Sequence, residues 1–456
     1  MTREVSIEKA FQEVGLGHAQ FVLLLICGLG FCADAAELGY ISYAVKALEK
    51  DWSLTPGEIV FLEQAVFVGQ MLGPVVWGQM ADRCGRRPAL LLSSTVVMAF
   101  GFLTAAVQNF WQLVLVRGGV GFGIAGLFLC ADIVGEMVPE QSAGRMMTTL
   151  NYFWPFGSMY TLFCTWLTLE TFGWRALTLC AALPTSIALL LGFFFLPESP
   201  RWLMEKNRHT DAVDTLKRMA RWNGVTVTFD EIRPLAHTEE LGLMALVQRG
   251  QQRRSFVLLS IIWFCMALGY FSILLCSVDI LRDSSEEALH DGLSLDYAAL
   301  GLSVGSELIS VTLSLKMLDT IGRVPTQAAM YILGGFCALL VGFRQLPYGI
   351  LAVAAVMCRC AVFCASSATW AHTPELFKTD VRGTAHALCN MTAKLGSLTA
   401  PFVVSQYFSA AAGGAIMAVS LAVASCSALM LPETMKRKAK VLLTFDPTEY
   451  AALQVS

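Results

Sequence analysis

Apolar segments as long as a membrane-spanning helix follow one another through most of this chain, and they limit the folds open to it. A helix of about 20 residues crosses a bilayer. Because the backbone in a bilayer must satisfy its own hydrogen bonds, such segments fold as helices. The sequence predicts an all-α membrane protein with twelve transmembrane helices, at roughly 21–45, 59–80, 88–107, 110–135, 146–169, 174–195, 255–279, 296–317, 326–343, 347–374, 383–408 and 412–431.

The composition agrees with a membrane protein and excludes several functional classes. Hydrophobic residues make up 55% of the 456 residues and charged residues only 15%, whereas soluble domains carry about 25% charged residues. A net charge of -3 offers no basic surface to nucleic acid, so no nucleic-acid partner is expected. The 14 cysteines lack the paired spacing of metal ligands and are predicted to be core thiols. No metal and no cofactor are predicted.

Two motifs occur twice at nearly the same separation. Residues Asp82–Pro88 and Asp319–Pro325 both read D-x-x-G-R-x-P, and Leu196–Ser199 returns as Leu431–Thr434. A repeat of this length in an apolar chain predicts two pseudo-symmetric six-helix halves around a central site. The expected organisation is a cytoplasmic N-terminal segment 1–20, a first half 21–196, a central cytoplasmic loop 197–254, a second half 255–434 and a cytoplasmic tail 435–456.

The distribution of basic residues orients the chain. They gather in one set of loops, which includes Arg83, Arg145, the stretch from Arg201 to Arg254 and the tail from Lys436 to Lys440. The positive-inside rule places these loops and both termini in the cytoplasm. Within the central loop, residues 212–222 carry apolar residues at helical spacing, which predicts an amphipathic helix on the inner membrane face. A solvated linker fits the same stretch.

Charged residues also lie inside the predicted spans. Asp34 and Glu37 are three positions apart and share a face of the first helix. An ionisable side chain in a bilayer costs about 2.5–3.5 kcal/mol on insertion scales, so each is a candidate for function. Two acids on one apolar face repel each other, which favours protonation of one of them and indicates proton coupling. A static ion pair that fixes helix packing is the alternative.

Four stretches resemble signatures of the major facilitator superfamily. Gly78–Arg87 resembles its loop motif, and Pro197–Trp202 and Pro432–Thr434 resemble the half-ending motifs of its sugar-porter and organic-ion branches. Thr373–Thr384 is similar to the tenth-helix motif of the same branches. The resemblance covers about residues 20–435. It implies the superfamily's fold of twelve helices in two pseudo-symmetric halves.

Three further stretches narrow the branch. Ala33–Glu37, Arg117–Gly126 and Lys394–Gly396 resemble the synaptic-vesicle-2-related proteins and the bacterial niacin and aromatic-acid symporters. Sugar porters carry paired glutamines on the seventh helix, where this chain reads Gly269–Ile273 without glutamine. Of the sugar porters' proline-tryptophan motif on the tenth helix, only Trp370 remains. These departures weaken the case for a sugar as the substrate.

The resemblance implies a secondary active transporter that works by alternating access, without enzymatic activity, as a monomer in the bilayer. We expect a small organic ion as substrate, a carboxylate above others, moved together with protons. A sugar or other neutral solute, or a non-transporting receptor or vesicle membrane protein, are the alternatives. The membrane is predicted to be the plasma membrane or an internal vesicle membrane.

The resemblance also assigns site residues. Related symporters pair a first-helix acid with a fourth-helix arginine, so Asp34, Glu37 and Arg117 are the predicted proton-coupling set. Lys394 matches a basic position near the substrate in organic-ion relatives; an ion pair with Glu307 is the alternative. The predicted substrate-binding residues are Tyr40, Tyr152, Trp154, Tyr270, Phe271, Trp370, Asn390 and Lys394, although aromatic residues at these positions also fit packing.

A cytoplasmic gate is expected at the repeated motifs. Asp82 is expected to cap a facing helix, Arg86 to reach Glu136, and Gly78 to let the second helix approach a neighbour closely. The alternative is that the arginines only set the topology. The predicted gate residues are Asp82, Arg86, Glu136, Arg145, Glu198, Asp319, Arg323, Glu375, Arg382 and Glu433.

Overall fold

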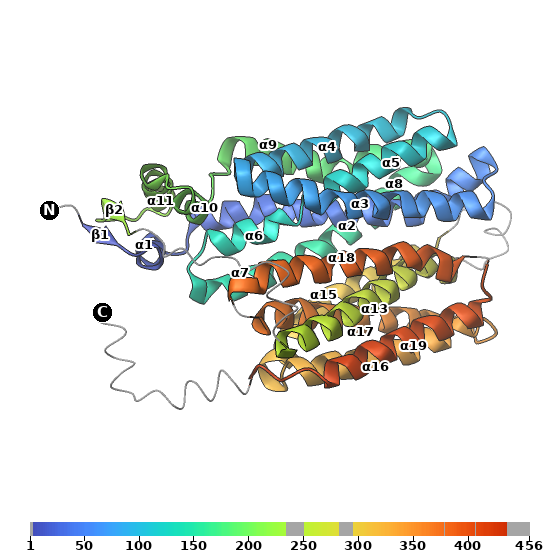
Figure 1. The fold of residues 1–456 in the computed structure, drawn as a ribbon. Helices are drawn as coiled ribbons and strands as arrows, with labels where there is room; N and C mark the ends of the chain where they lie inside the picture. Colours follow the sequence, from blue (N-terminus) through green and yellow to red (C-terminus); the bar gives the residue numbers. More distant parts are fainter. Residues whose placement is uncertain (1–2, 234–249, 282–294, 378, 406, 436–456) are drawn as a thin grey trace. The chain divides into compact units, whose positions relative to one another are not determined.

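A computed structural model describes residues 3–233, 250–281, 295–377, 379–405 and 407–435, and nearly all of their regular structure is helical (Figure 1). The predicted tail beyond Met435 and residues 234–249 of the predicted central loop lie outside the described residues. The elements are β1 (Glu4–Val5), α1 (Ile7–Val14), α2 (His18–Trp52), α3 (Pro56–Cys84), α4 (Arg86–Ala106), α5 (Phe110–Ile124), α6 (Leu129–Glu136), α7 (Glu140–Asn151), α8 (Phe153–Ala181), α9 (Leu183–Phe195), α10 (Pro200–Glu205), α11 (His209–Trp222), β2 (Glu231–Ile232), α13 (Gly250–Ile280), α15 (Tyr297–Thr320), α16 (Arg323–Gly342), α17 (Tyr348–Glu375), α18 (Thr379–Val404) and α19 (Ala410–Leu429).

Each predicted span overlaps helix in the structure, although the span at 110–135 is divided between α5 and α6 and the span at 383–408 extends beyond the end of α18. In the described part, ten helical stretches are long and apolar enough to cross a membrane, and one of them, Ser142–Phe195, contains both the fifth and the sixth predicted spans. Gly173 interrupts this stretch with a φ of 75°, between the predicted ends at 169 and 174. Such a φ is readily adopted only by glycine, which explains where the chain turns from one span to the next.

The start of α3 follows from a local signal in the sequence. Thr55 Oγ1 accepts a hydrogen bond from the backbone N–H of Glu58, and Glu58 Oε2 accepts one from the backbone N–H of Thr55 at 2.8 Å. This reciprocal pair satisfies donors that the first turn of a helix leaves open.

Glycines allow α3 and α5 to pack with their backbones almost in contact. A Cβ at Gly69 would lie 2.1 Å from the carbonyl oxygen of Gly118, and a Cβ at Gly121 would lie 1.9 Å from that of Val66. No other residue fits either position, as in the small-residue interfaces of membrane helices. A Cβ placed at Gly78 meets no described atom within 4 Å, so the close approach expected there stays a prediction.

The chain groups into two compact units. The first contains residues 1–238 and 274–308, and the second contains 239–273 and 309–456. Within the first unit, α2 packs against α8 and α9; within the second, α16 packs against both α17 and α19 (Figure 1). Residues 274–308 group with the first unit, although we assigned them to the second half, and the predicted domain boundaries stay a prediction.

Residues 3–17 and 197–233 fold together at one end of the first unit (Figure 1). We call α1, α10, α11, β1 and β2 the terminal module. The strands are parallel, with Glu4 opposite Glu231 and Val5 opposite Ile232. The helix predicted in the central loop is α11, which packs against α1 and buries its apolar face, so the linker alternative is wrong. Its buried residues are Ala212, Val213, Leu216, Met219 and Ala220.

Asn223 fastens this module to the first long helix. Its side-chain oxygen accepts the backbone N–H of Ala19 at 2.9 Å, and its amide nitrogen donates to the carbonyl of Val14 at 3.0 Å and to Gln20 Oε1 at 3.0 Å. One side chain therefore ties the end of α11 to the junction of α1 and α2.

We predict that Asn223→Ala loosens the module without unfolding the membrane helices. Three hydrogen bonds are lost, each worth about 0.5–1.5 kcal/mol. Limited proteolysis of the purified chain should cut residues 3–20 faster in this variant. Asp214→Ala, an exposed position of the same helix, is the control and should be cut at the wild-type rate; equal cutting of all three proteins would contradict the prediction.

Candidate functional site

The first unit holds an ion pair that is closed to solvent. Glu37 on α2 and Arg117 on α5 both have side chains that are 0% exposed. Arg117 Nη1 donates to Glu37 Oε2 at 2.7 Å, and Nη2 donates to the Glu37 backbone carbonyl at 2.8 Å. The two bonds hold α5 against α2 in one register. The contact expected between a first-helix acid and the fourth-helix arginine is present, and the acid is Glu37.

Neighbouring residues stabilise the cation of this pair and leave space for its carboxylate. The guanidinium carbon of Arg117 lies 4.9 Å from the centre of the Tyr40 ring, a contact that stabilises the cation. A Cβ at Gly101 of α4 would lie 3.2 Å from Glu37 Oε1, so this glycine leaves room for the carboxylate. Asp34, the other predicted acid, is partly exposed on the same helix.

Each member of the pair keeps one polar atom without a hydrogen-bond partner among the described residues. These atoms are Glu37 Oε1 and Arg117 Nε, and both are buried. A buried polar atom without a partner costs about 1–3 kcal/mol. The carboxylate therefore has an oxygen ready to take a proton, and the guanidinium has an N–H ready to meet an acceptor.

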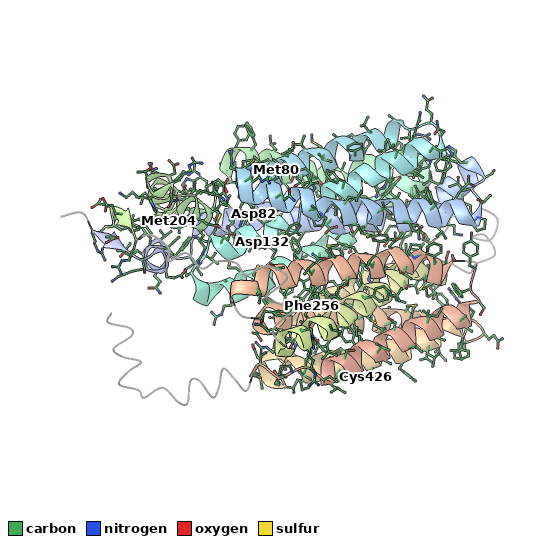
Figure 2. All side chains as sticks on the ribbon, in the orientation of Figure 1. Met80, Asp82, Asp132, Met204, Phe256 and Cys426 are labelled. Atoms are coloured by element: carbon green, nitrogen blue, oxygen red, sulfur yellow. The ribbon has the colours of Figure 1, made fainter. Side chains whose placement is uncertain are left out.

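A network of charges forms around the first copy of the repeated motif. Arg86 Nε donates to Glu136 Oε1 at 3.1 Å, and Arg86 Nη1 donates to Asp82 Oδ1 at 2.7 Å. Asp82 and Asp132 lie at the end of the helices that is nearest α10 (Figure 2). The expected contact between Arg86 and Glu136 is confirmed. We call Asp82, Arg86, Glu136 and Glu198 the first network.

A carboxylate of the first half-ending motif caps the start of α4. Glu198 Oε1 accepts the backbone N–H of Arg86 at 2.9 Å and that of Arg87 at 3.2 Å. These N–H groups have no partner within the helix, and the helix dipole favours a negative charge there. Asp82 binds the Arg86 side chain, and its expected capping of a facing helix stays a prediction.

The second copy repeats this arrangement at α16. Glu433 accepts the backbone N–H of Arg323 at 3.1 Å and that of Val324 at 2.9 Å. The Arg323 side chain forms a bidentate ion pair with Glu375, in which Nε donates to Oε2 and Nη2 donates to Oε1, both at 3.0 Å. Thr434 also donates to Glu375. We call Arg323, Glu375 and Glu433 the second network.

Glycine is required beside each capping carboxylate. Gly85 has a φ of 114° and Gly322 a φ of 103°. A Cβ at Gly85 would lie 2.1 Å from Glu198 Oε2, and a Cβ at Gly322 would lie 2.7 Å from Glu433 Oε2. The glycine in D-x-x-G-R therefore serves the backbone turn and the approach of the carboxylate together.

The two caps differ in their electrostatics. Burial raises the pKa of Glu198, and this effect outweighs the N–H donors of Ser199, Arg87 and Arg86 that act in the opposite direction. Burial also acts to raise the pKa of Glu433, but there the backbone N–H donors prevail, so its pKa is lowered. Glu433 therefore stays ionised at lower pH than Glu198.

Three predicted gate residues are not brought into these networks. Asp319 and Arg145 are exposed and form no ion pair within the described part of the chain. The side chain of Arg382 lies outside the described residues. Where Arg86 binds Asp82 in the first copy, Arg323 Nη1 donates to the backbone carbonyl of Leu318 at 2.9 Å.

The predicted substrate residues lie on different helices, and their role stays a prediction. Tyr270 contacts Phe271 and Phe363, with ring centres 5.3 and 5.7 Å apart. Trp370 contacts Trp263 at 4.7 Å. The predicted set falls on α2 (Tyr40), the junction of α7 and α8 (Tyr152), α8 (Trp154), α13 (Tyr270, Phe271), α17 (Trp370) and α18 (Asn390, Lys394).

Sequence reasoning missed several residues that support the site. Gly101 carries no motif, and its place beside Glu37 depends on how α4 packs. Trp263 is fully buried and donates to Thr373 Oγ1 at 3.0 Å, but a tryptophan in an apolar segment gives no sign of its partner. Arg201 of the half-ending motif contacts Glu8 and the backbone carbonyl of Glu136, which links the terminal module to the first network.

We predict that Gly85→Ala destabilises the protein, because the turn holds this position at a positive φ that alanine rarely adopts, and because the added Cβ would push Glu198 from the start of α4. A loss of about 1–3 kcal/mol is expected from the backbone alone. The thermal unfolding midpoint of the detergent-purified protein measures it. Gly78→Ala, where a Cβ meets nothing within 4 Å, is the control. Similar midpoints for both variants would refute the role of Gly85.

Comparison with known proteins agrees with this architecture. The family model described as "Sugar (and other) transporter" matches residues 30–440. The chain is 28% identical over 412 residues to Synaptic vesicle 2-related protein of Xenopus laevis, covering 87% of this chain and 75% of that protein. It is 25% identical over 440 residues to Organic cation/carnitine transporter 7 of Arabidopsis thaliana, covering 87% of each.

Solved structures show the same fold. The partially occluded, inward-open xylose transporter XylE from E. coli has a TM-score of 0.69 and 17% identity, covering 91% of this chain and 98% of that one. The structure of the proton:xylose symporter XylE bound to 6-bromo-6-deoxy-D-glucose has a TM-score of 0.68 and 18% identity, covering 91% of this chain and 96% of that one. The fold is the twelve-helix fold of the major facilitator superfamily, as predicted.

Proposed function

Because this chain belongs to the family of sugar and other transporters, we propose that it moves a small organic ion across its membrane together with protons. The family assignment makes it a multi-pass membrane transporter and not an enzyme. The substrate class and the proton coupling are our proposal. The buried pair of Glu37 and Arg117 is the observation that supports it.

The proposal follows from the cost of leaving a buried charge alone. Removing one partner of a buried ion pair costs about 3–5 kcal/mol. If a proton neutralises Glu37, Arg117 loses its counter-charge, and an anionic substrate restores it. The proton and the anion then bind as a neutral set, and neither is favourable without the other. This interdependence is the condition for symport.

In this mechanism Glu37 takes the proton at Oε1, which is the carboxylate oxygen without a partner in the described structure. Asp34 lies one turn away, is partly exposed, and passes the proton from water. Arg117 offers its N–H groups to a carboxylate. The first and second networks act as the cytoplasmic gate, since breaking them frees the starts of α4 and α16.

A carboxylate is favoured over a neutral substrate for two reasons. Arg117 and Lys394 place a cation in each predicted half, and cations bind carboxylates with charge-assisted hydrogen bonds. The paired glutamines of sugar porters are missing from Gly269–Ile273. The relative named an organic cation/carnitine transporter agrees with an organic ion, and carnitine itself carries a carboxylate.

Uptake into proteoliposomes tests this proposal. We expect one acid from a panel of nicotinate, benzoate, choline and glucose to accumulate only with an inward proton gradient. Uptake of glucose alone would favour the neutral-solute alternative. No uptake of any compound by folded protein would favour the receptor or vesicle-protein alternative, which the name of the Xenopus relative also suggests.

We predict that Glu37→Gln abolishes gradient-driven accumulation and lowers stability, because Arg117 is left without its counter-ion. The double variant Glu37→Gln with Arg117→Met removes both charges and should recover stability, since apolar replacements of buried pairs are often neutral or stabilising. It should still fail to accumulate substrate. Accumulation at the wild-type level by this stable double variant would show that the pair only fixes packing.

We predict that Lys394→Gln weakens the uptake of acids more than that of cations or neutral compounds. Its cation then contributes to binding the substrate carboxylate, and the loss should appear as about a tenfold higher KM. Lys316→Gln, an exposed lysine of α15, is the control. An equal effect on all substrate classes would refute a role in recognising charge.

The topology of the chain in its membrane also stays a proposal. We propose that both termini and the terminal module face the cytoplasm, on the basis of the basic loops that include Arg201 and Arg323. We propose a monomer in the plasma membrane or an internal vesicle membrane, and the name of the Xenopus relative agrees with the latter.

A further inference from the structure

His372 belongs to a row of buried polar side chains linked by hydrogen bonds, which the proposed transport mechanism does not use. The residue is on α17 and is 0% exposed. Its Nδ1 is 2.9 Å from the side-chain nitrogen of Gln327 on α16, and its Nε2 is 3.2 Å from the backbone carbonyl of Pro432. The imidazole therefore joins α16, α17 and the segment that follows α19.

The partners determine where the proton sits on this ring. A carbonyl oxygen only accepts, so Nε2 must carry a hydrogen to bind Pro432. The amide nitrogen of Gln327 only donates, so Nδ1 must accept and carry no hydrogen. Both bonds exist together only in the neutral ring.

Gln327 is held in this orientation from its other side. Its side-chain oxygen lies 3.3 Å from Thr369 Oγ1, and that hydroxyl lies 2.7 Å from the Tyr331 hydroxyl. All three residues are 0% exposed. Turning the amide to face a protonated ring would present its nitrogen, a donor, to Thr369 in place of the present acceptor.

The ring also lies among the charges of the second network. Burial opposes a positive charge on the His372 ring most strongly, and Arg323 on α16 repels one, whereas Glu375 on the same helix and Glu433 after α19 attract one. Pro432 directly precedes Glu433, the carboxylate that caps α16. A charge on the ring therefore acts on the same groups that hold the start of α16.

At the two equivalent positions of the first half, these hydrogen-bonded polar side chains have no counterpart. By the spacing between the two networks, Ile133 and Leu90 stand where His372 and Gln327 stand in the second half. Both side chains are apolar and take no proton. Any response that comes from His372 thus belongs to the second half alone.

We propose that His372 is a proton-sensitive positioning residue for the second network. The neutral ring links α17 to α16 through Gln327. A protonated ring breaks that link, repels Arg323 and competes with it for Glu375, so the start of α16 loosens as the pH falls. The inference deepens the gate proposed above and rests on it for its role in transport, but its structural content is tested without transport.

Hydrogen exchange of the full chain in lipid nanodiscs is the test. The readout is the protection factor of the backbone N–H groups of Arg323 and Val324. It is the ratio of the intrinsic exchange rate of an unstructured peptide at each pH to the observed rate. We expect protection to fall roughly fivefold between pH 7.5 and 5.0, the size expected from losing one neutral hydrogen bond. The lowered pKa of Glu433 keeps its carboxylate ionised in this range.

Three variants make the test specific. His372→Gln stays neutral at every pH and should lose the response. Gln327→Glu offers an acceptor to the protonated ring, so its protection should rise as the pH falls, which keeps the proposal testable if His372→Gln does not fold. His386→Gln is the control, because His386 on α18 contacts the rings of Trp263 and Trp370 and should keep the wild-type response.

Two results would overturn the proposal. One is equal protection of the wild-type protein at both pH values. The other is an unchanged pH response in His372→Gln or in Gln327→Glu. Because exchange is measured without substrate, a protein that fails to transport any compound still gives a clear answer about His372.

Discussion

A charge or an open backbone group inside a bilayer must find its partner in the chain itself, and this requirement explains most of the contacts described above. Burial shields the side chains of Glu37 and Arg117 from solvent, so each binds the other across two helices. The pairing fixes the register of α2 against α5. A small residue, Gly101, supplies the space that the carboxylate needs. Charge satisfaction and close packing are thus one constraint in this protein.

The same requirement explains why the repeated motif takes its form. The start of a helix leaves N–H groups open, and a distant glutamate answers them in both halves, Glu198 at α4 and Glu433 at α16. Glycine is needed at the turn in each copy because the carboxylate lies where a Cβ would be. The repeat therefore preserves a cap and its clearance, while the surrounding charges have diverged. Asp319 is exposed, and His372 has no polar equivalent in the first half.

Much of this architecture could be predicted from the sequence because its signals are local or repeated. A stretch of about twenty apolar residues in a bilayer folds as a helix, so the positions of most spans could be predicted from the sequence. The contact between Arg86 and Glu136 was expected from the motif and the resemblance. The sequence places Glu198 among the gate residues but does not predict that it caps α4, because the two segments are distant in sequence and meet only in the folded chain.

Other features depend on tertiary packing that no local pattern encodes. Gly101, Trp263 and the chain from His372 to Tyr331 acquire their partners only when helices distant in sequence come together. No structure is predicted for the N-terminal segment, yet α1 covers the apolar face of α11. The sequence of an amphipathic helix predicts that its apolar face is buried but does not identify what packs against it. Membrane lipid and a second helix satisfy that face equally well.

The parallel pairing of β1 with β2 has a consequence for the order in which the protein is made. Glu4 leaves the ribosome long before Glu231, its partner across the pair. At a synthesis rate of about 5–20 residues per second, the amino terminus waits roughly 10–45 s, while all the helices of the first half are inserted. The two short strands can close only behind a finished first half. Their pairing thus marks, in the nascent chain, that six spans have been completed before the next six begin.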